Sequence, residues 1–140
     1  MRIQRYASRL VFIVLMGFAG AVHAQGTPWA DEWQASALEG VLLPQFCWAQ
    51  MMQVQGPPEY YIPKECGPLS NHYCLALLKM VRADKLIGHR DWKKILYDGA
   101  KKDTKYTLDG WRSLPAPGCP LLPHAERTMI KIDTQLKILK

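Results

Sequence analysis

The fold follows from residues 69–86, which read LSNHYCLALLKMVRADKL. Apolar side chains recur there at steps of three and four residues, the spacing that places them on one face of an α-helix. That face consists of Leu69, Tyr73, Ala76, Leu77, Met80 and Val81. Ser70 or Asn71 can cap the start of the helix, and Gly88 ends the pattern. The segment therefore predicts a long amphipathic helix.

A second helix is predicted directly after it, over residues 89–110. Small residues at Gly99 or Ala100 would let a neighbouring helix approach closely. The two helices are therefore expected to pair as an antiparallel hairpin. The expected apolar face of the second helix contains Trp92, Ile95, Leu96, Tyr106 and Trp111.

The flanking regions also have helical patterns. Residues 31–43 predict a helix with Asp31 as its N-cap, and Pro44 suits the first turn of another helix over residues 45–54. Residues 124–139 predict a final helix, and segments 55–68 and 113–123 are proline- and glycine-rich loops. No segment alternates convincingly as a strand. The sequence thus predicts an all-α fold, a small disulfide-stapled bundle of four to five helices around a central antiparallel hairpin.

The first 24 residues have the pattern of a secretory signal peptide. Three arginines precede an apolar run over residues 10–22, and Ala24 ends a short cleavage motif. The uncharged run is shorter than the ~20 apolar residues that a membrane-spanning helix needs. We expect cleavage after Ala24, a single helical domain over residues 25–140, and membrane contact only through the transient signal peptide.

The charge argues against nucleic acid as a partner. The whole chain carries a formal net charge of +6, and removal of the three signal-peptide arginines leaves +3. Nucleic-acid binding requires several clustered Lys or Arg side chains that displace counterions. The expected partner is instead another envelope or secreted protein.

The four cysteines indicate two disulfides, because export carries the chain to a compartment in which thiols oxidise. Three pairings are possible. An antiparallel hairpin places the start of its first helix beside the end of its second, which favours Cys66 with Cys119 and leaves Cys47 with Cys74. Zinc is the alternative, but the spacing lacks a C-x-x-C knuckle.

Catalytic motifs are scarce in this sequence. No G-x-S-x-G elbow, phosphate-binding glycine loop or H-E-x-x-H motif occurs, so the chain is expected to be neither an enzyme nor a cofactor binder. Asp98, Asp103 and Asp109 alternate with lysines, which indicates a solvated helix face. The candidate binding residues are Tyr60 and Tyr61 in the proline-flanked loop, together with His72 on the adjoining helix. Packing of the loop onto the bundle is the alternative role for both tyrosines.

The pattern of residues 69–140 resembles the helix pair of tetratricopeptide-type repeats. Ala76, Ala100, Tyr106 and Pro115 are of the residue types that this family uses at its helix crossing and at its end. The resemblance implies a scaffold that binds a peptide or a protein in a groove.

Together these patterns predict an exported helical adaptor, a protein-binding accessory component in the periplasm or outside the cell. The first alternative is a periplasmic small-molecule or metal-binding protein that uses His72 and His124. The second alternative is a small hydrolase.

Overall fold

The computed structural model describes residues 33–140. The predicted signal peptide over residues 1–24, and the residues that follow it up to 32, lie outside this part of the chain. The described residues form five α-helices, namely α1 (Ala37–Gly40), α2 (Trp48–Met51), α3 (Asn71–Lys85), α4 (Arg90–Arg112) and α5 (Leu122–Ile138). Single 3-10 turns occur at Gln45–Cys47, Pro58–Tyr60, Lys64–Cys66 and Pro68–Ser70. No strand occurs among residues 33–140, and the predicted all-α class is confirmed.

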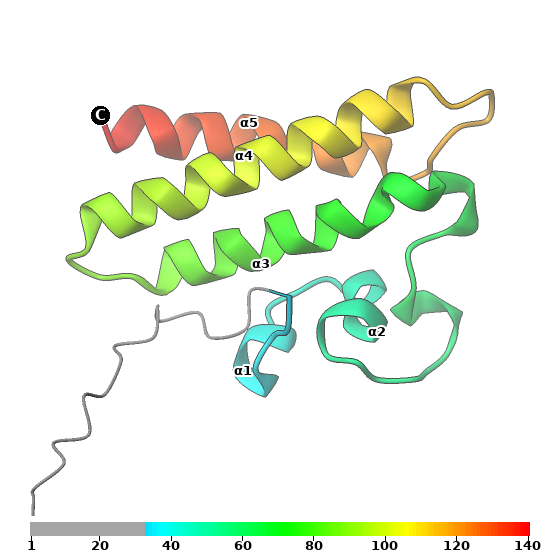
Figure 1. The fold of residues 1–140 in the computed structure, drawn as a ribbon, viewed down its shortest axis with the longest axis horizontal. Coiled ribbons are helices and arrows are strands. Elements are labelled where there is room, and N and C mark those ends of the chain that lie inside the picture. The colour runs from blue at the N-terminus through cyan, green and yellow to red at the C-terminus, as the bar shows by residue number, and fades with distance from the viewer. Residues whose placement is uncertain (1–32) are drawn as a thin grey trace, which may run out of the picture. The chain divides into compact units, whose positions relative to one another are not determined.

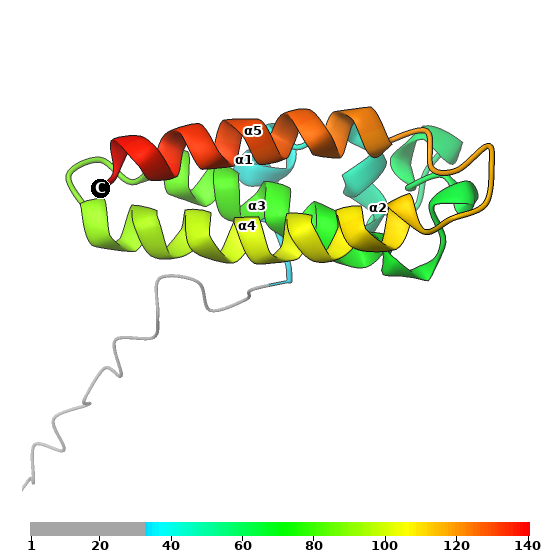
Figure 2. The same cartoon turned by 90° about the horizontal axis from the view of Figure 1, so that it is seen from above.

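The three long helices form the body of this region. Helix α4 runs back along α3, and α5 runs back along α4, while the short helices α1 and α2 lie against α3 (Figures 1 and 2). Tyr73 and Trp111 are fully buried, with ring centroids 5.1 Å apart, and join α3 to α4 in the core. Within residues 33–140, no helix has both the length and the apolar character needed to cross a membrane.

Both disulfides join the pairs that the hairpin geometry predicts. Cys47 is bonded to Cys74, which fixes the segment preceding α2 to the first turn of α3. Cys66 is bonded to Cys119, which fixes the end of loop 55–68 to the linker between α4 and α5. The bundle is therefore stapled at the end where α3 begins and α4 ends.

The predicted helix over residues 31–43 is wrong in extent. Only one helical turn forms, and Ser36 caps it, because Ser36 and Glu39 make reciprocal hydrogen bonds as a capping box. The turn ends at Gly40, where an added Cβ would lie 2.2 Å from the sulfur of Met52. The predicted cap, Asp31, lies outside the described residues. The absence of a side chain at Gly40 thus lets the end of this turn lie directly against Met52, the residue after α2.

Pro44 and the helix after it also differ from the prediction. Pro44 precedes a 3-10 turn and serves as its N-cap, whereas its expected place was inside the first helical turn. The predicted helix over residues 45–54 is divided between this turn and α2, and Gln53 has a positive φ of 54°. A non-glycine residue in that region of φ breaks helical geometry, so α2 cannot extend to residue 54.

Helix α4 buries a different face from the expected one. Leu96 and Trp111 are buried as expected, but Trp92, Ile95 and Tyr106 are exposed. The helix also buries Tyr97, Ala100, Thr104, Thr107 and Leu108. Tyr97 can be buried because its hydroxyl donates a hydrogen bond to Asp84 at the end of α3. At Gly99, an added Cβ would lie 3.3 Å from the side chain of Lys79, so this glycine accommodates a lysine of the neighbouring helix.

Candidate functional site

His72 lies in the first turn of α3 and belongs to a chain of charged groups. Its Nδ1 is 3.3 Å from Oδ1 of Asp103 on α4, and Oδ2 of Asp103 is 2.9 Å from Nζ of Lys79 on α3. The Asp103 and Lys79 side chains are only 15% and 16% exposed, whereas His72 is 33% exposed. The imidazole is therefore the most accessible group of the three.

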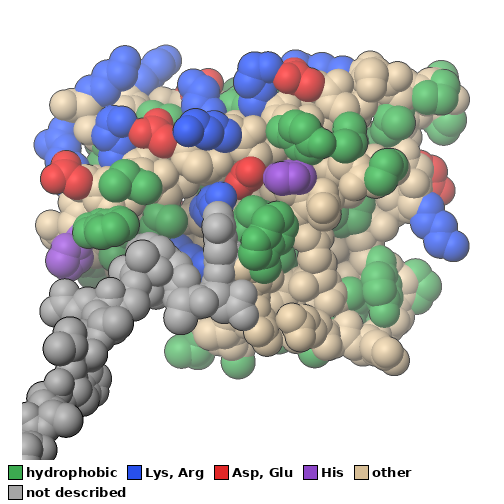
Figure 3. All heavy atoms as spheres, viewed as in Figure 1, with side chains coloured by type: hydrophobic (Ala, Val, Ile, Leu, Met, Phe, Trp, Pro, Cys, Tyr) green, Lys and Arg blue, Asp and Glu red, His purple; other side chains and the backbone are tan. Residues whose placement is uncertain are grey.

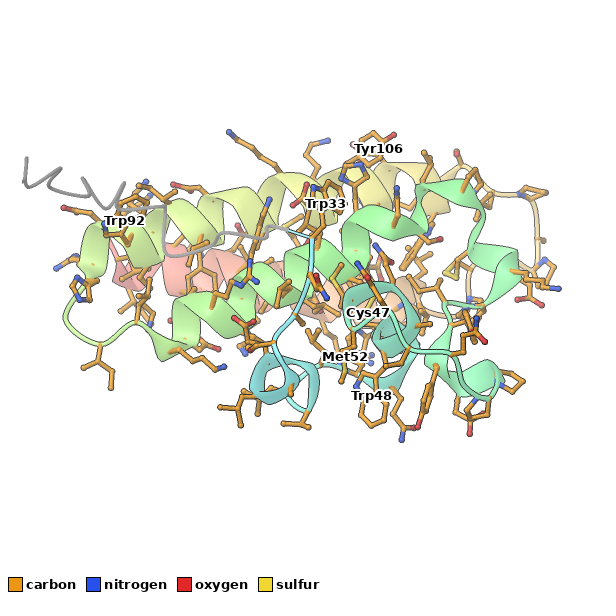
Figure 4. All side chains as sticks on the ribbon, turned by 60° about the horizontal axis from the view of Figure 1, so that its bottom comes forward. Trp33, Cys47, Trp48, Met52, Trp92 and Tyr106 are labelled. Carbon is orange, nitrogen blue, oxygen red and sulfur yellow. A yellow bond between two sulfur atoms is a disulfide. The ribbon has the colours of Figure 1, made fainter. Side chains whose placement is uncertain are left out.

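Two aromatic rings flank this imidazole. The ring centroid of Tyr106 lies 4.6 Å from that of His72, and the centroid of Trp33 lies 6.0 Å from it. Both aromatic side chains are 48% exposed. Figure 4 shows Trp33 and Tyr106 on the same side of the bundle, away from Trp48 and Met52. Figure 3 shows acidic, basic and hydrophobic side chains gathered together over the middle of one face. We call Trp33, His72, Lys79, Asp103 and Tyr106 the His72 cluster.

Asp103 orients the imidazole of His72. A ring nitrogen beside a carboxylate carries a proton, so Nδ1–H donates to Oδ1 of Asp103 and Nε2 points away from it. No described residue forms a hydrogen bond with Nε2. The nearest serine along the chain, Ser70, is buried and donates to the carbonyl groups of Cys66 and Gly67. The cluster thus presents an oriented imidazole between two aromatic rings, and the serine nearest to it along the chain is buried and bonded to backbone carbonyls.

Tyr60 and Tyr61 have different surroundings. The ring of Tyr60 packs on Trp48, with centroids 4.9 Å apart, and the lack of a side chain at Gly56 makes room for it. Tyr61 is 46% exposed. Tyr60 thus packs the loop onto α2, which is the structural role given above as the alternative to binding. Tyr61 faces outward.

Tyr61 borders an open hollow of about 640 Å³ at the end of the bundle. We call it the Tyr61 hollow. Its lining is apolar except for two polar side chains, and consists of Gln45, Phe46, Pro58, Glu59, Tyr61, Pro63 and Leu121. No described residue forms an ion pair with Glu59. The hollow and the His72 cluster have no residue in common, so the structure does not unite Tyr61 and His72 in one site.

His124 is half-buried and belongs to a polar network beside Phe46, which lines the hollow. Phe46 stacks on Tyr73 at 6.2 Å and meets the edge of the His124 ring at 5.6 Å. The Thr128 hydroxyl donates to the backbone carbonyl of His124. The Tyr73 hydroxyl therefore donates to Thr128 Oγ1, 2.9 Å away, and accepts from Nδ1–H of His124.

The electrostatics of this network favour its neutral forms. Burial raises the pKa of Tyr73 to about 12, although the positive charge of Arg127 acts in the opposite direction. Burial lowers the pKa of His124, and Arg127 lowers it further. His124 is thus a neutral group whose Nδ1 joins α5 to α3. Its hydrogen-bond partners are different from those of His72, and residues 33–140 contain no group of three or more side chains placed to hold a metal ion.

Comparison with known proteins gives no relative. No family model, curated protein or solved structure matches this chain. The site must therefore be interpreted from its own residues.

Sequence reasoning missed most of the residues that surround His72 and Tyr61. Asp103 was grouped with Asp98 and Asp109, which do lie on the solvated face and pair with Lys94 and Lys105 four residues away. Asp103 instead points to α3. On an α-helix, Asp103 lies on a different face from Asp98 and Asp109, and this difference could have been read from the sequence. No local signal in the sequence connects Phe46 or Leu121 with Tyr61.

Proposed function

We propose that this protein is a non-catalytic component that binds another exported protein through the Tyr61 hollow. One observation carries the proposal: an apolar hollow remains open beside a half-exposed tyrosine on a loop fixed by a disulfide. Aromatic side chains on a rigid support are typical of the residues that dominate protein interfaces.

The disulfides favour an oxidising compartment as the place where this protein works. Two disulfides are typical of extracellular or periplasmic proteins, and every cysteine of this chain is in one of them. Export itself is proposed from the signal-peptide pattern of residues 1–24. The partner would therefore be an envelope or secreted protein.

The chemistry of the hollow suggests what the partner presents. An apolar side chain fits against Phe46, Leu121 and the two prolines, and a Lys or Arg next to it would face Glu59. Glu59 is the one charged side chain that lines the hollow, so the hollow itself carries a negative charge. A segment with one apolar anchor and a neighbouring basic residue complements it.

Binding is favoured over catalysis by the arrangement around His72. A hydrolase of the acyl-transfer type needs a nucleophile within hydrogen-bond reach of its base. Ser70 is buried and bonded to backbone carbonyls, so it does not supply one. The tetratricopeptide resemblance remains a prediction that agrees with a binding role.

Site-specific photo-crosslinking in the native envelope tests the proposal. A photoreactive phenylalanine analogue in place of Tyr61 should crosslink to one protein, while the same analogue at Ile130, an exposed residue of α5, should not. Leu121→Asp and Glu59→Lys should both weaken the crosslink without altering the helical circular dichroism. Equal labelling from both positions, or no labelling from position 61, would contradict the proposal.

A further inference from the structure

We propose that a hollow between α4 and α5 binds a phosphate monoester group. Four lysines line it, namely Lys94, Lys101, Lys137 and Lys140, and we call it the lysine hollow. It shares no residue with the Tyr61 hollow or with the His72 cluster, so the inference does not depend on the proposed protein partner. Three observations support it: the facing helices, the charge of the lining and the size of the hollow.

Helical spacing brings the lining together from two facing helices. Lys94 and Lys101 lie two turns apart on α4, and Lys137 lies one turn after Asp133 on α5. Nζ of Lys101 is 2.6 Å from Oδ1 of Asp133, so an ion pair joins the two faces. Leu136 is buried and is the one apolar side chain of the lining. The hollow is thus a charged groove closed at its base by packing between the helices.

The lining holds more ammonium groups than carboxylates. Lys101 is paired with Asp133, and in the same way Nζ of Lys94 lies 2.7 Å from Oδ2 of Asp98. Among residues 33–140, no carboxylate forms an ion pair with either of the other two lysines. Four lysines against two aspartates leave a net side-chain charge of +2. Each ammonium group also has three N–H donors, so even the paired lysines keep donors for a ligand.

The same two helices carry the net positive charge of the described chain. Residues 90–140, which include α4 and α5, contain eleven Lys and Arg against six Asp and Glu, whereas residues 33–89 contain four against four. Figure 3 shows Lys and Arg side chains gathered along α4 and α5. A field of this sign raises the local concentration of anions. The ligand of the lysine hollow should therefore be an anion.

A phosphate monoester fits the hollow better than the other common anionic groups. It carries close to two negative charges at neutral pH and has three acceptor oxygens, so it balances the charge of the lining and can accept from several ammonium groups. Carboxylates, sulfate esters and phosphodiesters carry one negative charge each. The hollow has a volume of about 370 Å³, near the lower end of the range for small-molecule sites. It can therefore hold the phosphate and a small part of the molecule that carries it.

Titration of the exported, disulfide-bonded protein with glucose 6-phosphate tests the proposal. The readout is the backbone amide resonances of a ¹⁵N-labelled sample. We expect saturable shifts in α4 and at the end of α5, with a Kd on the order of 1 mM or tighter. Glucose 6-sulfate is the matched probe, because it has nearly the same size and one negative charge fewer. It should bind at least about fivefold more weakly.

A second measurement distinguishes a soluble phosphate from a membrane headgroup. Phosphatidic acid also presents a phosphate monoester, so phosphatidylcholine vesicles with roughly one quarter phosphatidic acid are the membrane probe. Co-sedimentation with these vesicles, and not with pure phosphatidylcholine, would assign the site to a lipid headgroup. Shifts from glucose 6-phosphate without co-sedimentation would assign it to a soluble phosphorylated molecule. Both results support binding of the phosphate group.

Matched double variants separate this site from the general charge of the protein. Lys137→Gln combined with Lys140→Gln should weaken binding by about tenfold, because it removes the excess positive charge of the lining. Lys64→Gln combined with Lys102→Gln lowers the net charge equally but lies outside the lining, and should weaken binding by no more than about twofold. All four side chains are exposed, so both variants should keep the helical circular dichroism.

Three results would overturn the proposal. They are the absence of binding to both glucose 6-phosphate and phosphatidic acid vesicles, equal affinity for glucose 6-phosphate and glucose 6-sulfate, and equal losses in the two double variants. None of them would affect the photo-crosslinking test at Tyr61, so the two proposals fail independently.

Discussion

The bundle formed by α3, α4 and α5 is stabilised differently from the segment over residues 33–70. The bundle buries its own large side chains, including Tyr73, Tyr97 and Trp111. The N-terminal segment has only short helical turns, and contacts with α3 hold it: the Cys47–Cys74 disulfide, the Glu39–Arg82 ion pair and a hydrogen bond from Gln50 to Asn71. Short helices are marginal in water. The bundle thus depends on packing along its long helices, whereas residues 33–70 depend on a few specific cross-links to α3.

Removal of the central tryptophan should affect the bundle most. Trp111 is 1% exposed and contacts Tyr73, so Trp111→Ala should lower the free energy of unfolding by about 3–5 kcal/mol. Trp48 of the N-terminal segment is the matched comparison. Trp48→Ala should cost clearly less, because this side chain is only partly buried. Urea unfolding measures both values, and equal losses would show that the two regions share one core.

Removal of one disulfide should affect the N-terminal segment selectively. The variant with Cys47→Ala and Cys74→Ala loses a cross-link over 27 residues, which should cost roughly 3 kcal/mol. Hydrogen exchange should accelerate at residues 35–52 and change little in α4 and α5. A uniform acceleration across all five helices would contradict the distinction between the regions.

The ion pair between Glu39 and Arg82 should contribute less than the disulfide. Burial alone would raise the pKa of Glu39, but hydrogen bonds from Arg82 and Ser36 outweigh burial and lower it below its ordinary value of 4.5. Glu39→Gln should lower the free energy of unfolding at pH 7 by about 2 kcal/mol, because it removes charge-assisted hydrogen bonds. Glu65→Gln, at an exposed position, is the control.

The same pair has a defined dependence on pH. A carboxylate with a lowered pKa in the folded state stabilises the protein above pH 4.5, and this contribution is lost as the pH falls through the lowered pKa. The difference in stability between the native protein and Glu39→Gln should therefore shrink toward pH 3. A difference that stays constant with pH would mean that the Glu39 charge has no such role.

The half-buried His124 of the bundle should produce the smallest effect. Because the pKa of His124 is lowered in the folded state, the unfolded chain takes up the proton first as the pH falls below 6.5. The free energy of unfolding should therefore decrease from pH 7.5 to pH 5.5. His124→Asn should reduce this slope, whereas His89→Asn, at an exposed position, should leave it unchanged. Identical slopes in both variants would contradict the assignment.

Sequence periodicity predicted the bundle well and the N-terminal segment poorly, for a physical reason. Apolar spacing along α3 and α5 reports on one continuous buried face, so the boundaries of these helices agree with the prediction to within about two residues. The short helix α1 instead packs against Met52 and pairs with Arg82, and both lie outside its own sequence pattern. Local patterns contain no information about such contacts.

The candidate sites show the same limit. His72 and Tyr61 could be selected because a histidine and a loop tyrosine stand out in the sequence. Helix α4, however, has large apolar side chains on two faces, and only packing against α3 and α5 determines which face is buried. Tyr106 thus remained exposed next to His72, contrary to the expected apolar face.

The position of the two disulfides has a mechanical consequence. Both lie where α3 begins and α4 ends, whereas the opposite end, at the turn between α3 and α4, has only non-covalent contacts such as those from Arg90 to the carbonyl groups of Ile138 and Leu139. Ile87 in that turn is 89% exposed and adds little to the core. Under heat or tension the helices should separate first at this unlinked end. The disulfide-bonded end should hold the helices in register, so that they can pack together again when the stress is removed.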